Sequence, residues 1–303
     1  MSHLRLSDQV VFVVGAGASA PYEIPVASRL RERLLERNHP SVPGELEHRR
    51  EILNLRWSSF QAAFRRSGLI SVDRFLQRRP EFSEIGQWGI SSVIGLAEAD
   101  AMSKGSRFDD WHGWLVNTVF ANDEFGSPRS RFVTFNYDRL LELVLAECAA
   151  ARTNGDALAC YLEAVAPTVR HVYGKLSSQL REDAERGYVV PDTSPKGILQ
   201  SGRGIRIAGQ QPDDSDEGLE DLREWISDAK QVVFLGFSFD HENLKQLGLS
   251  PTQDTRDIKI GKFFACCYGM SAGERRRVNE HFHGRITLGD ASLTAHEFLR
   301  HVT

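Results

Sequence analysis

The segment "QVVFVVGAGASAPYEIP", residues 9–25, sets the expected fold. Its first seven residues form a continuous apolar run, which predicts a strand buried on both faces of a parallel sheet. The run ends in glycines and small residues that lead into a helical pattern, where a backbone can approach a diphosphate beside a helix N-terminus. Candidate ligand-binding residues are therefore Gly15, Ala16, Gly17 and Ser19. A tight strand-to-helix turn without a ligand is the alternative explanation.

This loop departs from the dinucleotide-binding pattern of dehydrogenases. It reads G-x-G-x-S and lacks the third glycine of G-x-G-x-x-G. In addition, no acidic residue ends a second strand about 20 residues later, as that fold requires. The sequence therefore disfavours a plain dehydrogenase.

Four further apolar runs, each bounded by glycine or polar residues, predict buried strands. These are residues 131–136, 169–174, 231–238 and 262–269. Helical patterns alternate with the runs, at residues 25–37, 138–151 and 217–229. Alternation of this kind predicts an α/β fold, with a Rossmann-like, doubly wound and mostly parallel sheet.

Residues 38–127 interrupt the alternation. They contain no convincing strand, show helical periodicity and hold four of the five tryptophans, most of which we expect in a core. We predict a mainly helical insertion subdomain (38–127) after the first strand and loop, with 1–37 and 128–303 forming the Rossmann-like domain. Residues 183–219 are rich in turn formers and predict loops, apart from one short strand candidate, "IRIAG" (205–209).

Composition and charge argue against several classes of protein. The 37 basic and 41 acidic residues give a net charge of −4, so no direct nucleic-acid site is evident. No two of the four cysteines form a C-x-x-C pair, so neither zinc nor another metal is expected. There is no signal-peptide pattern and no 18-residue apolar stretch, which predicts a cytoplasmic protein without a membrane segment.

The second predicted strand ends in "TFNYDRLLE", residues 134–142. Asn136 and Asp138 would then lie at the carboxyl edge of the sheet, where ligands bind in open α/β folds. Both residue types also cap helices well, and capping alone is the alternative explanation.

The third predicted strand carries "VRHVYGKL", residues 169–176. Residues two apart on a strand share a face, so His171 and Tyr173 are predicted to project together just before Gly174, where the chain can turn. A histidine with only a structural role in the strand is the alternative.

The fourth predicted strand ends in "LGFSFDHEN", residues 235–243. Gly236 and Ser238 give this strand end a small, polar character, and Asn243 follows in a polar turn. A turn with a helix cap is the alternative explanation.

In this order, the four motifs resemble those of the sirtuin-like domains of bacterial antiphage defence proteins. "GAGASAPYEIP" resembles the sirtuin pattern G-A-G-x-S-x-x-x-G-I-P, which includes Pro25, and "TFNYD" resembles T-Q-N-x-D. "VRHVYG" falls where the family has a histidine before glycine, and "LGFSFDHEN" where it has G-x-S and a polar turn. "SVDRFL" (71–76) resembles a motif in the insertion of the defence members. The similarity spans roughly residues 9–245, in a family whose fold is Rossmann-like.

The resemblance implies that NAD+ is the substrate. In the family pattern Asn136 orients the ribose and a water, Asp138 supports the loop, and the histidine bonds a ribose hydroxyl or acts as a base. A side chain that titrates near neutrality suits the base role. Here Tyr173 occupies the position before glycine, so either His171 takes over or the site binds NAD+ and turns it over poorly. By the same resemblance the NAD+-binding residues are Gly15, Ala16, Gly17, Ser19, Pro25, Gly236, Ser238 and Asn243.

The activity implied by the resemblance is that of an NAD+ glycohydrolase, which releases nicotinamide and ADP-ribose as the depletion effector of an antiphage (abortive infection) system. The two C-x-x-C pairs that hold zinc in deacetylating sirtuins are missing, which disfavours lysine deacetylation. A homo-oligomer and a regulatory partner are expected, such as a hexameric DNA-translocating ATPase or a short argonaute. Two alternatives stay open: a catalytically weak or silent NAD- or nucleotide-binding subunit of a larger defence assembly, and a transferase that uses the same cleavage.

Overall fold

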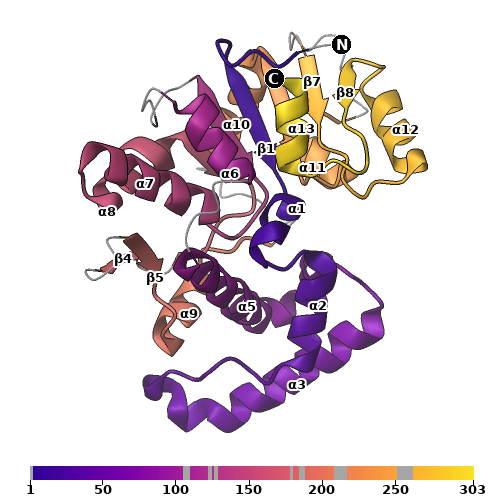
Figure 1. Cartoon of the computed structure of the whole chain (residues 1–303). Helices are drawn as coiled ribbons and strands as arrows, with labels where there is room; N and C mark the ends of the chain where they lie inside the picture. Colours follow the sequence, from indigo (N-terminus) through magenta and orange to yellow (C-terminus); the bar gives the residue numbers. More distant parts are fainter. Residues whose placement is uncertain are drawn as a thin grey trace.

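A six-stranded parallel sheet forms the centre of the molecule (Figure 1). The computed structural model describes residues 3–104, 110–121, 125, 129–177, 180–183, 188–207, 217–250 and 262–303. The sheet has the order β3-β2-β1-β6-β7-β8, and all neighbouring strands run parallel. Its strands are β1 (Val10–Val14), β2 (Ser130–Thr134), β3 (Val169–His171), β6 (Gln231–Leu235), β7 (Lys262–Ala265) and β8 (Ile286–Leu288).

Counted along the chain, the strands of this sheet lie in the order 3-2-1-4-5-6, which is the doubly wound order of dinucleotide-binding folds. The direction of winding reverses between β1 and β6, so the loops that follow these two strands leave the middle of the sheet side by side. The predicted Rossmann-like α/β fold is confirmed, and all five predicted runs contribute strands. The prediction missed β8, because three residues are too short an apolar run to indicate a strand.

Helices cover both faces of the sheet, as a doubly wound fold requires. Alternate residues of β1 divide between two apolar cores, with Phe12 in the larger core and Val11 and Val13 in the smaller one. On the larger core lie α6 (Trp111–Trp114), α7 (Leu140–Thr153) and α13 (Ala295–Val302). On the smaller core lie α10 (Glu217–Asp228), α11 (His241–Gln246) and α12 (Ala272–His281).

Between β1 and β2 the described chain is helical, as predicted. Its elements are α1 (Ala16–Ser19), η1 (Ala20–Tyr22), α2 (Ala27–Glu36), η2 (Gly44–Arg49), α3 (Arg50–Ser67), α4 (Val72–Arg78), η3 (Pro80–Phe82), α5 (Ser83–Ser103), α6 and η4 (Leu115–Val119). In Figure 1, α2, α3 and α5 lie together below the sheet, whereas α6 packs on α7 and α13. The four tryptophans of this segment are buried, as expected for core residues. The division at residues 38 and 127 stays a prediction.

The segment between β3 and β6 differs from the prediction of loops over residues 183–219. It contains an antiparallel hairpin of β4 (Leu180–Asp183) and β5 (Tyr188–Pro191), followed by α9 (Pro195–Gly202), which packs along α5. Proline, serine and glycine indicated turns here, but Pro195 at the first helical position and the Ser194 cap begin a helix. Three short helices precede β3: α8 (Ala157–Cys160), η5 (Tyr161–Val165) and η6 (Ala166–Thr168).

Strand β3 is also shorter than predicted, because it ends at His171 rather than at residue 174. Gly174 has a φ of 67°, which turns the chain, and it makes a single bridge to Ile205. That bridge is all that the described residues form of the predicted strand at 205–209, and residues 208–209 lie outside them. Tyr173 therefore lies beyond the strand.

Gly236 is required by the close approach of the loops after β1 and β6. Its φ is 59°, and a Cβ atom there would lie 2.0 Å from the backbone nitrogen of Ala18. We expect Gly236→Ala to lower the free energy of unfolding by about 2–3 kcal/mol, because strain and a backbone clash act together. Gly284→Ala is the control: its φ is 72° but it faces open space, so about 1 kcal/mol is expected. Equal losses in urea denaturation would show that the two loops separate freely.

Candidate functional site

The predicted site residues gather at the carboxyl ends of β1, β2 and β6. The loop after β1 contacts the loop after β6 through backbone atoms, since the Gly15 nitrogen donates to the Leu235 oxygen (2.9 Å) and the Gly17 nitrogen donates to the Gly236 oxygen (3.1 Å). A Cβ on Gly15 would lie 2.6 Å from the Gly236 oxygen. This contact explains why glycine stands at these positions without any ligand. Ala16 and Gly17 remain exposed, whereas Pro25 is buried.

Ser19, Asn136 and Asp138 form a buried chain of hydrogen bonds that joins the β1 and β2 loops. Asn136 Nδ2 donates to Ser19 Oγ (2.9 Å), and Ser19 Oγ donates to Asp138 Oδ1 (3.3 Å). Because the Ser19 hydroxyl gives its single proton to Asp138, it can only accept from Asn136, which fixes the amide nitrogen toward Ser19. Asn136 Oδ1 is thus directed away from Ser19, and it is buried with no partner among the described residues. The chain leaves one oriented acceptor unused.

Burial raises the pKa of Asp138 to about 7, and the negative charge of Glu98 adds to the effect. Glu98 itself is paired with Arg139, through an Nη2 to Oε2 contact of 3.2 Å in which the two side chains are 0% and 3% exposed. The other Glu98 oxygen accepts the backbone N–H of Arg139. Helix α5 therefore fixes the residue that follows Asp138.

The Asp138 proton is held more tightly in the folded protein than in the unfolded chain, where the carboxyl has its ordinary pKa of 3.8. Its contribution to stability is therefore present below pH 3.8 and is lost as the pH rises through about 7. We expect Asp138→Asn to stabilise the protein by about 2 kcal/mol at pH 8 and to change little at pH 4. Urea denaturation at both pH values measures this. Asp228→Asn, at an exposed position, is the control and should change the free energy of unfolding by less than about 0.5 kcal/mol at either pH. An equally small change for Asp138→Asn at pH 8 would contradict the raised pKa of Asp138.

His171 is held between the β2 loop and α7. Its Nδ1 lies 2.9 Å from the Asn136 backbone oxygen and its Nε2 lies 2.7 Å from Glu142 Oε2. Burial alone would raise the pKa of Glu142, but His171 and Lys175 outweigh it and lower the pKa to about 2. The two ring nitrogens of His171 thus face two acceptors, a backbone carbonyl and a carboxylate. Lys175 Nζ completes the cluster by donating to Glu142 Oε1 (2.9 Å) and to the Tyr161 hydroxyl (3.0 Å).

Tyr173 reaches a different set of partners from His171. Its hydroxyl donates to Asn243 Oδ1 (2.8 Å), and Asn243 Nδ2 lies 3.4 Å from Ser238 Oγ. Burial raises the pKa of Tyr173, so its hydroxyl stays protonated at neutral pH. The prediction that His171 and Tyr173 project together is wrong, because the strand ends between them and their side chains contact separate elements.

The motif "SVDRFL" docks the helical segment onto both loops. Ser71 caps α4 by accepting from the Arg74 nitrogen (3.2 Å), and the apolar residues of the motif are buried. Asp73 accepts the hydroxyl of Tyr137, which lies between Asn136 and Asp138 in the chain, while Arg74 pairs with Asp240 of the β6 loop. The charged residues of the motif thus contact the residues that surround the site.

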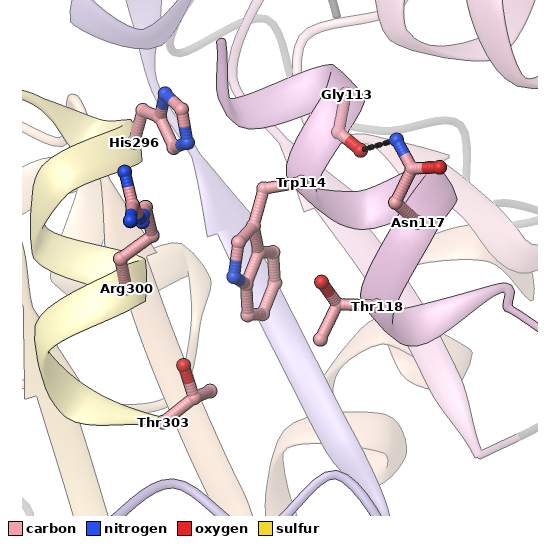
Figure 2. Close-up of a pocket in the computed structure, with 7 residues that line it drawn as sticks. All are labelled: Gly113, Trp114, Asn117, Thr118, His296, Arg300 and Thr303. Atoms are coloured by element: carbon pink, nitrogen blue, oxygen red, sulfur yellow. Dashed lines mark hydrogen bonds between the residues drawn. The ribbon is translucent and has the colours of Figure 1, made fainter. Parts of the chain in front are cut away.

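Among the described residues, two cavities adjoin these side chains, and others lie elsewhere. A cavity of about 630 Å³ at the β3 edge is lined by His171 and Lys175 among others, and one of about 400 Å³ between α11 and α12 is lined by Ser238, Phe239 and Met270 among others. A third, of about 430 Å³, lies between α6 and α13. Figure 2 shows that its wall comes from those two helices and η4, and none of the predicted site residues lines it.

Several site residues were missed by the sequence analysis. Glu98 and Glu142 are buried charges within the helical runs "VIGLAEADAM" and "LLELVL", and a carboxylate inside a largely apolar run was the available signal. Arg139 and Lys175, their partners, carried no such signal. Among the described residues no group of three His, Cys, Asp or Glu side chains is arranged to hold a metal ion. None of the described helices combines the length and apolar character needed to cross a membrane.

Comparisons with known proteins give matches among solved structures alone. No protein-family model matches the chain, and no curated protein matches it. It is similar to the structure of Sir2Tm bound to a propionylated peptide, with 14% identity, a TM-score of 0.35, and coverage of 98% of this chain and 93% of that chain. It is also similar to a Sir2 mutant with a p53 peptide and NAD (15%, TM-score 0.40, 98% and 93% covered), and to a Sir2 homologue mutant with 2′-O-acetyl ADP ribose (13%, TM-score 0.41, 97% and 91% covered). At such scores the similarity carries no inference about activity.

The chain is an α/β protein with a Rossmann-like, six-stranded parallel sheet and a helical segment after its first strand.

Proposed function

We propose that the chain is an NAD+ glycohydrolase that cleaves NAD+ to nicotinamide and ADP-ribose. The observation that carries the proposal is the buried Asn136 carboxamide, oriented by Ser19 and Asp138, with Oδ1 unpaired at the carboxyl edge of a doubly wound sheet. Ligands of such sheets bind at this edge, close to the strand where the winding reverses. The similarity of "GAGAS" and "TFNYD" to sirtuin motifs supports the same assignment.

The reaction breaks the bond between ribose C1′ and the nicotinamide nitrogen, whose positive charge is neutralised as nicotinamide leaves. A water oxygen bonds to C1′ and gives up one proton. Asn136 Oδ1 would accept a hydrogen bond from that water or from a ribose hydroxyl and so hold the reacting groups in line. That proton would go through the Ser19 hydroxyl, which donates to Asp138 Oδ1, so that Asp138, with a pKa of about 7, is its final acceptor, while the Asn136 carboxamide orients the water and carries no proton.

The contacts of His171 and Tyr173 support different roles for the two residues. His171 is occupied on both ring nitrogens and fixes the Asn136 backbone, so we assign it a positioning role. Tyr173 faces Asn243 and Ser238 of the β6 loop, where its hydroxyl is placed to hydrogen-bond a ribose hydroxyl. The role of the family histidine would thus be divided, with Tyr173 taking its part in binding and Asp138 its part in proton transfer.

This assignment is tested by separating kcat from KM. We expect Tyr173→Phe to raise KM for NAD+ about tenfold, because one hydrogen bond to the substrate is lost. His171→Gln should lower kcat and leave the acidic limb of the pH profile in place, because that limb belongs to Asp138, with its pKa of about 7. Disappearance of the limb in His171→Gln would make the histidine the base.

As a biological role we propose depletion of NAD+ in antiphage defence, with a homo-oligomer and a regulatory partner that releases the activity. The support is the similarity of the four motifs and of "SVDRFL" to the defence members of the family. A silent NAD-binding subunit is the second candidate, and it is favoured by the burial of Asn136 and Asp138, each 7% exposed. Nicotinamide release, measured by chromatography with and without the neighbouring gene products, distinguishes the two. Binding of NAD+ without release under every condition would support the subunit.

A further inference from the structure

A separate cavity of about 200 Å³ lies between α3, α5 and α9. In Figure 1 these three helices lie below the sheet. Leu53, Ile85 and Trp88 form its buried apolar wall. Gly202, at the end of α9, closes another side, since a Cβ there would lie 3.0 Å from the Gln87 backbone oxygen. None of the residues assigned to NAD+ cleavage lines this cavity.

Three guanidinium groups converge on the cavity from elements far apart in the sequence. Arg49 ends η2, Arg56 lies in the second turn of α3, and Arg203 follows α9. Glu84, also on the rim, pairs with Arg56 at 2.9 Å. Arg49 and Arg203 are exposed, and no side chain or carbonyl of the described residues accepts from their guanidinium groups. The rim therefore carries two positive charges without a negative partner, an arrangement that attracts an anion.

The wall also holds an unsatisfied donor. Trp88 Nε1 is buried and has no acceptor among the described residues, although a buried indole N–H is normally paired. A ligand oxygen in the cavity that Trp88 lines would supply the acceptor that this N–H lacks. An apolar wall, an unpaired donor and a cationic rim together define a site for an amphipathic anion.

We propose that this cavity binds a small molecule with a compact apolar body and one carboxylate or phosphate group. The body packs against Leu53 and Trp88, and the anionic group pairs with Arg49 and Arg203. The volume of about 200 Å³ lies below the roughly 300 Å³ at which drug-sized ligand pockets begin, so the body is about one ring in size.

The cavity is joined to the proposed NAD+ site by two short connections, and this part of the inference rests on the proposed function. Helix α5 carries Trp88 at the cavity and Glu98 at Arg139, next to Asp138. After Arg203, the Gly204 oxygen accepts from the Lys175 nitrogen (3.0 Å), beside the cluster that holds His171. A ligand that shifts α5 or α9 would therefore move the Asn136 loop, which makes the cavity an effector site.

The test uses the side-chain N–H signals of the five tryptophans in ¹⁵N-labelled protein. Trp88→Phe identifies the Trp88 signal by its loss. Phenyl phosphate and benzoate, which distinguish a phosphate from a carboxylate, are titrated beside neutral benzyl alcohol. We expect one or both anions to shift the Trp88 signal saturably and benzyl alcohol to have at least tenfold lower affinity. Arg203→Gln should weaken binding of the anion about tenfold, whereas Arg66→Gln, an exposed arginine of α3 away from the cavity, should not.

Calorimetric titration of the same ligands into wild-type protein, Arg203→Gln and Arg66→Gln needs no assigned signal, so a Trp88→Phe chain that fails to fold does not stop the test. Absence of binding, equal binding of benzyl alcohol, or equal affinity in Arg203→Gln would overturn the site. Trp111 reports the connection, because its Nε1 donates to the Ala18 oxygen (2.8 Å) in the β1 loop. Its signal should move with that of Trp88, while Trp225, in the core of the opposite face, should not. A Trp111 signal that stays fixed overturns the connection, independently of whether NAD+ is cleaved.

Discussion

Asn136→Ala is expected to lower the rate of nicotinamide release from NAD+ by about 100-fold or more. The substitution removes the Asn136 Oδ1 acceptor, which faces away from Ser19. It also removes the hydrogen bond that Asn136 Nδ2 donates to Ser19 Oγ. Both changes act on the geometry of the transition state, so the loss should appear in kcat. The rate is measured by chromatography of nicotinamide, and the thermal midpoint confirms that the chain is folded.

Asn117→Ala is the matched control for this prediction. The Asn117 carboxamide donates to the Gly113 oxygen (2.8 Å) at the cavity between α6 and α13, which none of the proposed site residues lines (Figure 2). Its removal should leave the rate unchanged. Wild-type activity in Asn136→Ala, or an equal loss in Asn117→Ala, would refute the role of Asn136. Asn136→Asp is a more specific variant, because it keeps the size of the side chain but an ionised carboxylate cannot donate to Ser19. The activity of Asn136→Asp should therefore also be low.

Glu98→Ala is expected to lower the free energy of unfolding by about 3–5 kcal/mol. Arg139 would keep its buried guanidinium without the carboxylate that neutralises it, and the Arg139 backbone N–H would lose its acceptor. The loss arises because a buried charge is deprived of its paired carboxylate, rather than from the value of the pair itself. Urea denaturation measures it.

The double substitution Glu98→Leu with Arg139→Leu tests that reasoning, because replacing both charges with apolar groups should restore most of the stability. The exposed pair of Arg29 and Glu32, at 2.8 Å, supplies the control, and Glu32→Ala should cost less than about 1 kcal/mol. A loss at Glu98 as small as that at Glu32 would mean that water reaches Arg139. The reasoning would also fail if the double variant were less stable than Glu98→Ala.

Glu98 has two opposite effects on the stability of the fold. Glu98 stabilises the fold through Arg139, yet its charge also helps to raise the pKa of Asp138. The pKa of Asp138 thus lies near 7, and the protein loses stability above that pH, where the buried carboxyl ionises. Shifted pKa values of this kind are common among groups that transfer protons. The loop that carries Asn136 is held on one side by α5 and on the other by His171.

The sequence by itself determined the sheet. Five continuous apolar runs ending in glycine or polar residues were sufficient for an α/β fold, because strands buried on both faces must be apolar throughout. Ser19, Asn136 and Asp138 were also named from the sequence, by residue type and by their place after a strand, and the structure brings these three side chains together. The hairpin β4–β5 and helix α9 were missed, because prolines and glycines that begin or end helices have the same composition as loops.

Only the tertiary structure decided what each polar residue contacts. His171 and Tyr173 are two residues apart, and their roles separated once β3 ended at His171 and the chain turned at Gly174. Glu142 and Glu98 belong to ordinary helical patterns, and they acquired their importance from His171, Lys175 and Arg139, which other elements bring to them. The spacing of apolar residues in the sequence indicates which face of a single helix or strand is buried. Hydrogen bonds and charge pairs depend on distances between elements, which local sequence does not encode.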